Sequence, residues 1–326
     1  MISFGTMLQS AKGISNYLKI HADDRMLSYL PLPHVFERWG VESHSIYVSF
    51  PLFFAENIDT FLQDLRRAQP TLFISVPRLW LKFQLGVFQK IPQKKLNQLL
   101  KIPILKNIIK KKILKGMGLN QVRFAATGSA PIPKEIIEWY RNIGLELLEG
   151  YGMTENLAYS HLTKPGEVRP GYVGSPCPDV HQRISKDGEV LVKSPCNMMG
   201  YFKMPKKTKE AFTEDGFLRT GDLGKIDEKG RFKITGRAKD LFKTSKGKYV
   251  APAPIENLIS NHPLVEACNV SGLGYPQPYG VVMLSDEARG GGLNKEKNQP
   301  SKENSQSTLI LLTAILRPMS VWRSWP

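Results

Sequence analysis

The chain carries two short charged signatures in close succession, RTGDLG at residues 219–224 and GRAKD at residues 236–240. A glycine that permits a tight turn precedes Asp222 in the first signature, and another precedes Arg237 in the second. A carboxylate accepts hydrogen bonds from hydroxyl groups and a guanidinium donates to oxygens, so this pair suits a ribose diol. Each signature alone is also typical of an ordinary β-turn with a surface ion pair.

Short apolar segments alternate with helical patterns upstream of these signatures. We expect strands at residues 71–76, 122–127 and 145–149 and helices at residues 78–88 and 134–142. Late in the chain we expect a helix at residues 252–261 and a strand at 265–270. The alternation predicts an α/β layered domain. From about residue 175 short strands are broken by turn pairs such as Asp187-Gly188 and Lys229-Gly230, which predicts hairpins in a small β subdomain.

Three further motifs complete the set: GSAPIP at residues 128–133, YGMTE at 151–155 and KTSKGKYVAP at 243–252. In this order the five motifs resemble those of the AMP-forming adenylate synthetase superfamily, most closely its long-chain fatty acyl-CoA synthetases, over about residues 30–288. The resemblance implies an adenylate-forming large domain with a small β subdomain over residues 1–235, and the start of a small α+β C-terminal domain over residues 236–288. Residues 289–326 lose all periodicity, and we expect a divergent, disordered tail there.

Enzymes of this kind join a fatty acid carboxylate to the α-phosphate of ATP with release of pyrophosphate, and the CoA thiolate then displaces AMP. The resemblance therefore implies ATP/AMP, Mg²⁺ and CoA as cofactors and a fatty acid as substrate. It assigns Thr154 to the α-phosphate and Glu155 to Mg²⁺, a hard cation that takes oxygen ligands. Taken alone, Thr154 and the acidic residue after it are typical of a helix N-terminus.

The resemblance also implies an adenosine pocket. The loop that would lie against adenine consists of Gly128, Ser129 and Ala130. Such small residues permit a close approach of the backbone to a flat ring. Tyr151, which Gly152 follows, would stack on the other face of the ring, and Asp222 with Arg237 would bind the ribose.

His34, in LPLPHVFE at residues 30–37, resembles the family position beside the acyl carboxylate, although a lone histidine is also typical of a helix cap. Lys239 resembles the hinge about which the small domain swings between the two half-reactions. Lys243, Lys246 and Gly247 would face the nucleotide and CoA in the second state. A surface hairpin with solvated lysines is the alternative for that loop.

Two parts of the family pattern are absent from the sequence. The Ser/Thr/Gly-rich phosphate loop would precede residue 1, and the catalytic lysine of the C-terminal domain has no counterpart after residue 289. Because these groups cradle and neutralise phosphate charge, we expect a chain that is truncated at both ends and inactive alone. The alternatives are a non-catalytic remnant that binds adenylates or membranes, and acyl transfer to another acceptor such as an acyl carrier protein.

The composition is that of a globular protein, since 41% of the 326 residues are hydrophobic. Three widely spaced cysteines form no metal or redox motif and indicate reduced thiols. No stretch reaches the roughly 20 apolar residues that cross a bilayer. We therefore expect a cytoplasmic protein.

The net charge of +16 is unevenly distributed, because residues 82–115 hold ten lysines and no acidic residue. Leu105, Ile108, Ile109 and Ile113 recur there at helical spacing, which predicts an amphipathic helix with its lysines on another face. Such a helix is typical of a solvated surface, or of peripheral attachment to anionic lipid on the inner face of a membrane. The basic run has no interleaved aromatic residues for base stacking and does not favour nucleic acid.

Overall fold

The computed structural model describes residues 1–260, 262, 264–284 and 288–289. The chain divides into two compact units, of which the first is Met1–Thr235 and the second begins at Gly236. Apart from Arg289, the tail expected at residues 289–326 lies outside the described residues.

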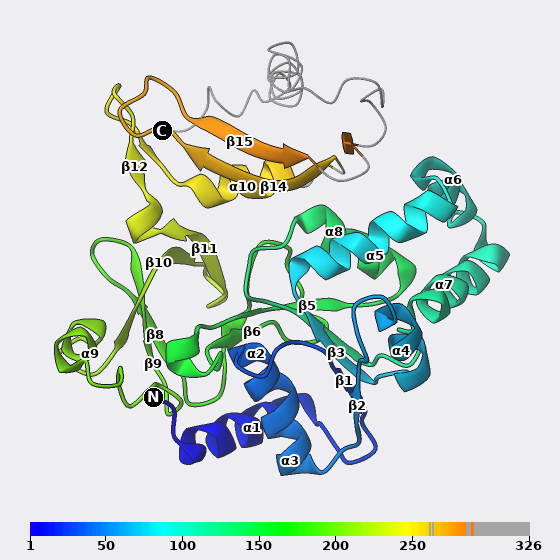
Figure 1. Ribbon diagram of the computed structural model, residues 1–326, viewed down its shortest axis with the longest axis horizontal. Helices are drawn as coiled ribbons and strands as arrows, with labels where there is room; N and C mark the ends of the chain where they lie inside the picture. The colour runs from blue at the N-terminus through cyan, green and yellow to red at the C-terminus, as the bar shows by residue number, and fades with distance from the viewer. Residues whose placement is uncertain (261, 263, 285–287, 290–326) are drawn as a thin grey trace. The chain divides into compact units, whose positions relative to one another are not determined.

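A five-stranded sheet in the order β3-β4-β5-β6-β7 forms the centre of the first unit (Figure 1). Its parallel strands are β3 (Leu72–Ser75), β4 (Phe124–Thr127) and β5 (Leu147–Tyr151). The short strands β6 (His161–Leu162) and β7 (Ser175–Pro176) continue the sheet in antiparallel pairing. Helix α5 (Pro77–Lys90) follows β3 and helix α8 (Lys134–Ile143) follows β4, as the sequence predicts.

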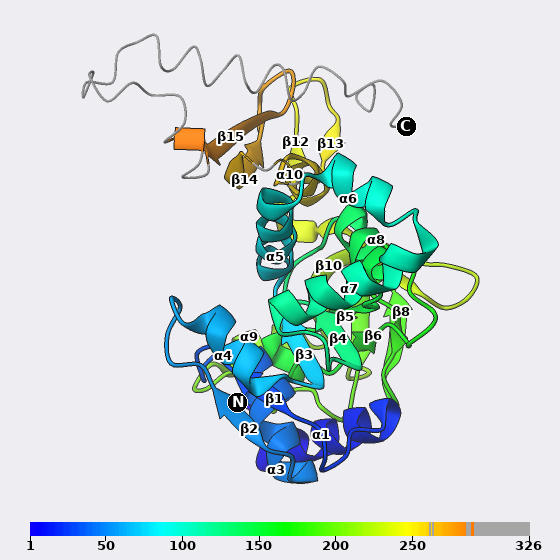
Figure 2. The same ribbon diagram turned by 90° about the vertical axis from the view of Figure 1, so that its right-hand side faces the viewer.

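Successive residues of the parallel strands belong to two different hydrophobic cores, because side chains alternate across a strand. Leu72, Phe124 and Leu148 lie in one core, whereas Phe73, Ala125 and Leu147 lie in the other. Helices α1 (Phe4–Leu18), α2 (Val35–Glu37) and α3 (His44–Val48) lie on the first face of the sheet, and α5 and α8 lie on the second (Figures 1 and 2). The predicted α/β layered domain is confirmed.

A four-stranded sheet in the order β11-β10-β9-β8 forms the β subdomain. Its strands are β8 (His181–Ile184), β9 (Glu189–Lys193), β10 (Leu218–Ile226) and β11 (Phe232–Arg237). The turns between β8 and β9 and between β10 and β11 hold the predicted Asp187-Gly188 and Lys229-Gly230 pairs. Strands β1 (Met26–Ser28) and β2 (Leu52–Phe54) form a separate parallel pair, and helix α9 (Pro205–Ala211) precedes β10.

The second unit is a small α+β arrangement. Strands β12 (Phe242–Lys243) and β13 (Tyr249–Val250) form a short hairpin. Helix α10 (Pro252–Ser260) then packs on the antiparallel pair β14 (Val265–Ser271) and β15 (Tyr279–Leu284). The helix and the first strand of this pair match the elements expected at residues 252–261 and 265–270.

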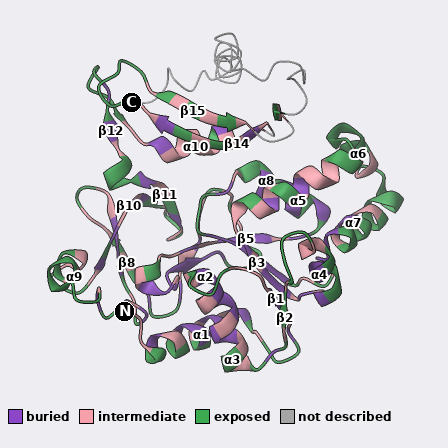
Figure 3. Cartoon of the chain, viewed as in Figure 1, coloured by how far each residue is buried: buried purple, intermediate pink, exposed green. Residues whose placement is uncertain are grey.

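Helices α4 (Phe61–Ala68), α6 (Gln93–Leu99) and α7 (Pro103–Met117) complete the second face of the first unit. The helix predicted in the lysine-rich stretch is present, but the predicted assignment of its faces is wrong. Most of α7 is exposed (Figure 3). Ile113 and Met117 are its buried residues, whereas Leu105 and Ile108 are exposed. Its apolar residues occur on opposite sides, so spacing alone could not identify the side that meets the core.

Cys177, Cys196 and Cys268 are free thiols, as expected. Within the described part of the chain, no helix combines the length and the apolar character that crossing a membrane requires.

Candidate functional site

An apolar cavity lies along the parallel strands of the first unit and reaches their carboxyl ends, the edge at which α/β proteins usually bind ligands. Its volume is about 70 Å³. The segments that line it include residues 127–129 at the end of β4, residues 150–152 at the end of β5, and the stretch that contains Phe36, Trp39 and His44. The cavity is smaller than the roughly 300–1,000 Å³ of most small-molecule pockets, so it accommodates only part of a ligand in this conformation.

Close backbone packing fixes the segment after β5. A Cβ atom on Gly152 would lie 2.5 Å from the Cα atom of Ala158, so no other residue fits without a backbone shift. Leu157 and Ala158 have φ angles of 51° and 54°, in the left-handed region that non-glycine residues seldom adopt. Ser129, across the cavity, has a φ of 67°. Strain of this kind is concentrated at ligand-binding loops, where the surrounding structure enforces it.

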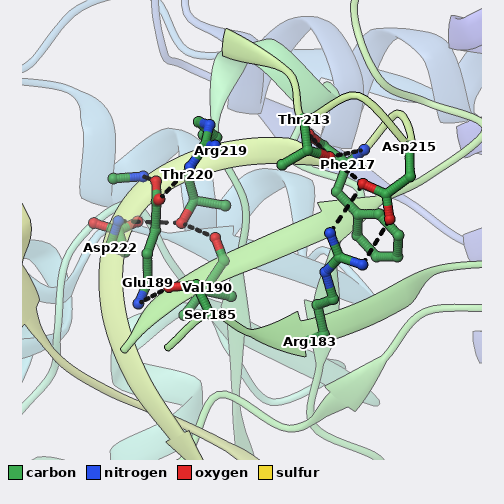
Figure 4. Close-up of polar contacts among 11 residues, drawn as sticks. Arg183, Ser185, Glu189, Val190, Thr213, Asp215, Phe217, Arg219, Thr220 and Asp222 are labelled. Atoms are coloured by element: carbon green, nitrogen blue, oxygen red, sulfur yellow. Dashed lines mark hydrogen bonds and ion pairs between the residues drawn. The ribbon is translucent and has the colours of Figure 1, made fainter. Parts of the chain in front are cut away.

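Tyr151 and Asp222 meet although they are 71 residues apart in the sequence: the Tyr151 hydroxyl donates to Asp222 Oδ2 at 2.6 Å, and both residues are buried. The backbone N–H of Asp222 donates to Thr220 Oγ1 at 3.1 Å, and the Thr220 hydroxyl donates to the carbonyl of Val190 at 2.7 Å. Glu189 accepts from the N–H of Gly221 at 3.0 Å (Figure 4). The β subdomain therefore holds the Asp222 carboxylate in place next to the end of β5.

Glu155 lies in the 3-10 helix Thr154–Asn156, directly after this segment. Its Oε1 accepts a hydrogen bond of 2.9 Å from the Tyr201 hydroxyl, and the side chain is half-buried. Met153, not Thr154, is the N-terminal cap of this short helix; Thr154 is its first residue and Glu155 lies in its first turn. Thr154 is exposed and lines a separate, wider hollow of about 630 Å³ that Arg38 and Glu42 also line.

Three polar atoms on residues that line the apolar cavity have no hydrogen-bond partner within the described chain. They are Trp39 Nε1, His44 Nε2 and Thr127 Oγ1. Burial lowers the pKa of His44 to about 4, so its ring is neutral near pH 7. Its Nδ1 lies 2.6 Å from the Trp39 carbonyl, which only accepts, so Nδ1 carries the proton and Nε2 is an acceptor. Buried polar atoms without partners are rare in proteins and typical of sites that a ligand or water completes.

Comparisons with known proteins identify the family. A family model described as AMP-binding enzyme matches residues 1–202. The chain belongs to the AMP-binding enzyme family. Long-chain-fatty-acid--CoA ligase 1 of Homo sapiens is 35% identical over 280 residues, which cover 76% of this chain and 39% of the relative. Long chain acyl-CoA synthetase 6, peroxisomal, of Arabidopsis thaliana is 29% identical over 345 residues, which cover 92% of this chain and 49% of the relative. The chain spans half or less of the length of these relatives.

Solved structures of adenylate-forming enzymes share the fold. The ATP-bound RpMatB-BxBclM chimera B1 has a TM-score of 0.71 and 27% identity, and the match covers 98% of this chain and 58% of that chain. O-succinylbenzoate coenzyme A synthetase from Bacillus subtilis, in complex with AMP, also has a TM-score of 0.71; its 22% identity is evidence of the fold alone.

The structure brings together part of the predicted site. Four predicted residues line the cavity: Gly128, Ser129, Tyr151 and Gly152. Asp222 joins them through Tyr151, whereas Ala130 is exposed beside the loop. His34 is exposed and caps α2, where its Nδ1 accepts from the N–H of Phe36 at 3.2 Å.

The cavity-lining residues Trp39 and His44 were not predicted from the sequence. Both belong to a stretch that includes a π-helix, Arg38–Ser43, a local geometry that is frequent at functional sites. No sequence pattern predicts a π-helix. The available signal in the sequence was the spacing of Phe36 and Trp39, which lie three positions apart and would share one side of a helix.

The remaining predicted residues lie in the second unit. Arg237 ends β11, and Lys239 lies in the short 3-10 helix Ala238–Asp240, just after the first unit ends. Lys243 belongs to β12, with its Nζ 5.4 Å from the centre of the Tyr249 ring. Lys246 and Gly247 form the tip of the β12–β13 hairpin, where Gly247 has a φ of 80° and its N–H donates to the Thr244 carbonyl at 2.9 Å.

Proposed function

We propose that this chain forms the adenylate-binding and acyl-binding part of an AMP-forming fatty acid–CoA ligase. The observation that supports the proposal most strongly is the meeting of three distant segments, residues 127–129, residues 150–152 and Asp222, at the end of one parallel sheet. The relatives named as long-chain acyl-CoA ligases support the substrate class.

In this proposal Tyr151 and the loop at residues 128–130 hold adenine, and Asp222 holds the ribose. A carboxylate can accept about four hydrogen bonds, so the bond from Tyr151 is compatible with bonds from ribose hydroxyls. Thr154 would donate to the α-phosphate. Arg237, Lys243, Lys246 and Gly247 take the nucleotide and CoA roles that the family resemblance implies, and Lys239 takes that of the hinge.

The apolar cavity is the proposed entrance for the acyl chain. The fatty acid carboxylate attacks the α-phosphorus of ATP, the bond to the bridging oxygen breaks and pyrophosphate leaves; the CoA thiolate then attacks the acyl carbon and AMP leaves. In the first step the chain's own groups orient the two reactants. The apolar walls of the cavity exclude water from them. His44, neutral and buried, lies too deep in the first unit to act as a charged group.

Glu155 is the proposed Mg²⁺ ligand. Among the described residues no group of three or more His, Cys, Asp or Glu side chains could hold a metal ion. One carboxylate nevertheless fits Mg²⁺, which proteins commonly hold through one or two carboxylates with the substrate phosphates. When bound, the ion would neutralise phosphate charge, and Tyr201 would orient the Glu155 side chain toward it.

The whole reaction belongs to a protein of the relatives' length, so the direct test on this chain is binding. Calorimetry should detect AMP binding, at least as tight as ATP binding. The variant Asp222→Asn should weaken it by about 1–3 kcal/mol, the usual cost of an unmatched polar partner. The matched control is Asp215→Asn, in the same subdomain, where Arg183 donates to both carboxylate oxygens at 2.6 and 2.9 Å. Equal affinities for the wild type and Asp222→Asn, with both proteins folded, would refute the ribose assignment.

A further inference from the structure

The first half of α7 is largely exposed. None of residues 103–112 is buried, and Ile104 and Ile108 have 81% and 60% of their surface accessible. Ile102, directly before the helix, is 44% exposed. Single exposed apolar residues are common on proteins, but three within seven positions form a patch, which usually marks an interaction surface.

The helical repeat places these isoleucines and several lysines on one stripe. Ile104, Ile108, Lys111 and Lys115 follow one another at intervals of four, three and four residues, so they share the outward side of α7. Lys112 lies beside this stripe, and all three lysines are exposed. Ile109, Ile113 and Met117 occupy the opposite side and pack in the core.

Lys110 does not belong to the outward face. A Cβ atom on Gly144 would lie 3.8 Å from Lys110 Cδ, which shows that the aliphatic part of this lysine packs against the end of α8. Burial and the nearby Lys106 lower the pKa of Lys110. The exposed lysines that belong with the isoleucines are therefore Lys111, Lys112 and Lys115.

The positive charge of this stretch indicates the kind of partner that the surface would bind. No acidic residue occurs between Lys82 and Lys115, so the ten lysines there are not balanced by neighbours in the sequence. We propose that the outward face of α7, together with the exposed Lys94 and Lys95 of α6, is a docking surface for an anionic lipid bilayer. Lysines bind the headgroup charge while exposed isoleucines enter the boundary between headgroups and acyl chains.

Nucleic acid is the other polyanion that a lysine cluster could bind. Proteins that hold single strands combine cations with aromatic side chains on which bases stack. Between Ile91 and Met117 the sequence has no aromatic residue, and the exposed apolar groups are isoleucines. The surface therefore fits lipid better. The proposal goes beyond the ligase function and stands without it, because attachment is measured with no nucleotide or CoA present.

The experiment is co-sedimentation of the full chain with vesicles of phosphatidylcholine and phosphatidylglycerol, and with vesicles of phosphatidylcholine alone, at low and high salt. We expect attachment to the anionic vesicles only, weakened at high salt by screening. One variant replaces Lys111, Lys112 and Lys115 with Gln, and a second is Ile104→Ser with Ile108→Ser. Each lysine near an anionic surface contributes up to about fivefold in partitioning, so the triple variant should lose at least about tenfold.

The matched control changes Lys206, Lys207 and Lys209 of α9 to Gln, which removes the same charge from another exposed helix. This control should bind vesicles as the wild type does, and thermal melts should show all variants folded. The proposal is overturned by equal losses in the control and the α7 variant, by equal binding to neutral vesicles, or by no binding. Tighter binding to a single-stranded oligonucleotide that the α7 variant abolishes would replace the lipid with nucleic acid.

Discussion

The first and second units hold their predicted site residues in very different ways. In the first, Tyr151 and Asp222 are buried and joined by a hydrogen bond of 2.6 Å, and Gly152 is packed against the backbone of Ala158. In the second, Lys246 lies at the exposed tip of a hairpin. The buried group is arranged before any ligand binds, whereas an exposed lysine loses side-chain freedom when it contacts one.

The difference separates two kinds of contribution. Changes in the first unit should affect both stability and adenylate binding, because the same contacts serve both. Changes at the hairpin should affect stability little, because exposed charged residues contribute little to it.

The largest expected effect comes from Gly152→Val. The added Cβ would meet backbone atoms of Ala158 at 2.5–2.6 Å, and backbone cannot move aside as a flexible side chain can. We expect a loss of roughly 3 kcal/mol or more in the free energy of unfolding, measured by denaturant titration. The control is Gly86→Ala in α5, where nothing lies within 4 Å of the added Cβ. That change should stabilise the helix, and a similar loss for both variants would show that Gly152 is not specially packed.

The second effect is a pH dependence of stability centred on Glu149. Burial raises the pKa of its carboxyl group from the usual value near 4.5 to about 8, and the hydrogen bond that the N–H of Gly171 donates to it opposes this shift only in part. A carboxyl group with a raised folded pKa contributes stability below pH 4.5 that is lost as the pH rises toward 8. Glu149→Gln has no such proton. Between these pH values it should gain on the wild type by about 1.4 kcal/mol for each pH unit. Parallel pH profiles of stability for the two proteins would contradict this account.

Local patterns were sufficient to predict much of the fold. Strands β3, β4 and β5, helices α5 and α8, and the hairpin turns follow from apolar spacing and turn residues within a few positions of each other. The loops at residues 128–130 and 151–155 were located through motif order. These features depend on neighbours in the sequence, which is why sequence reasoning reached them.

The features that sequence reasoning missed depend on neighbours in space. Apolar residues occur on two sides of α7, so periodicity could not show that Ile113 meets the core while Ile108 faces outward. The π-helix and the left-handed conformation of Ala158 occur in segments that line the cavity, and no local sequence pattern indicates them. The contact between Tyr151 and Asp222 joins two sheets, and no pattern in the chain links them.

A smaller effect is expected for Tyr151→Phe, which removes only the hydroxyl that donates to Asp222. AMP affinity should fall by about 1 kcal/mol, the usual net value of one hydrogen bond. Tyr249→Phe is the matched control, because Tyr249 is 71% exposed on the second unit's hairpin. If the control lowers AMP affinity as much as Tyr151→Phe does, the buried and exposed regions do not differ as described.

The smallest effect is expected for Lys246→Ala. The free energy of unfolding should change by no more than about 0.5 kcal/mol, as for most surface substitutions. AMP affinity measured by calorimetry should remain that of the wild type, because the role proposed for Lys246 concerns the state that receives CoA. A large loss of AMP binding would place this lysine with the preorganised group and would contradict the division between the two regions.

The central claim is that the nucleotide-binding segments and the apolar cavity form one site. The most direct test compares the affinity of AMP with that of a non-hydrolysable acyl sulfamoyl adenosine carrying a short alkyl chain, both measured by calorimetry. Burial of about two methylene groups is worth roughly 1.5 kcal/mol, so the acyl compound should bind about tenfold more tightly. Trp39→Ala should change this difference while leaving AMP affinity in place. Equal affinities of AMP and the acyl compound for the wild-type chain would contradict the account.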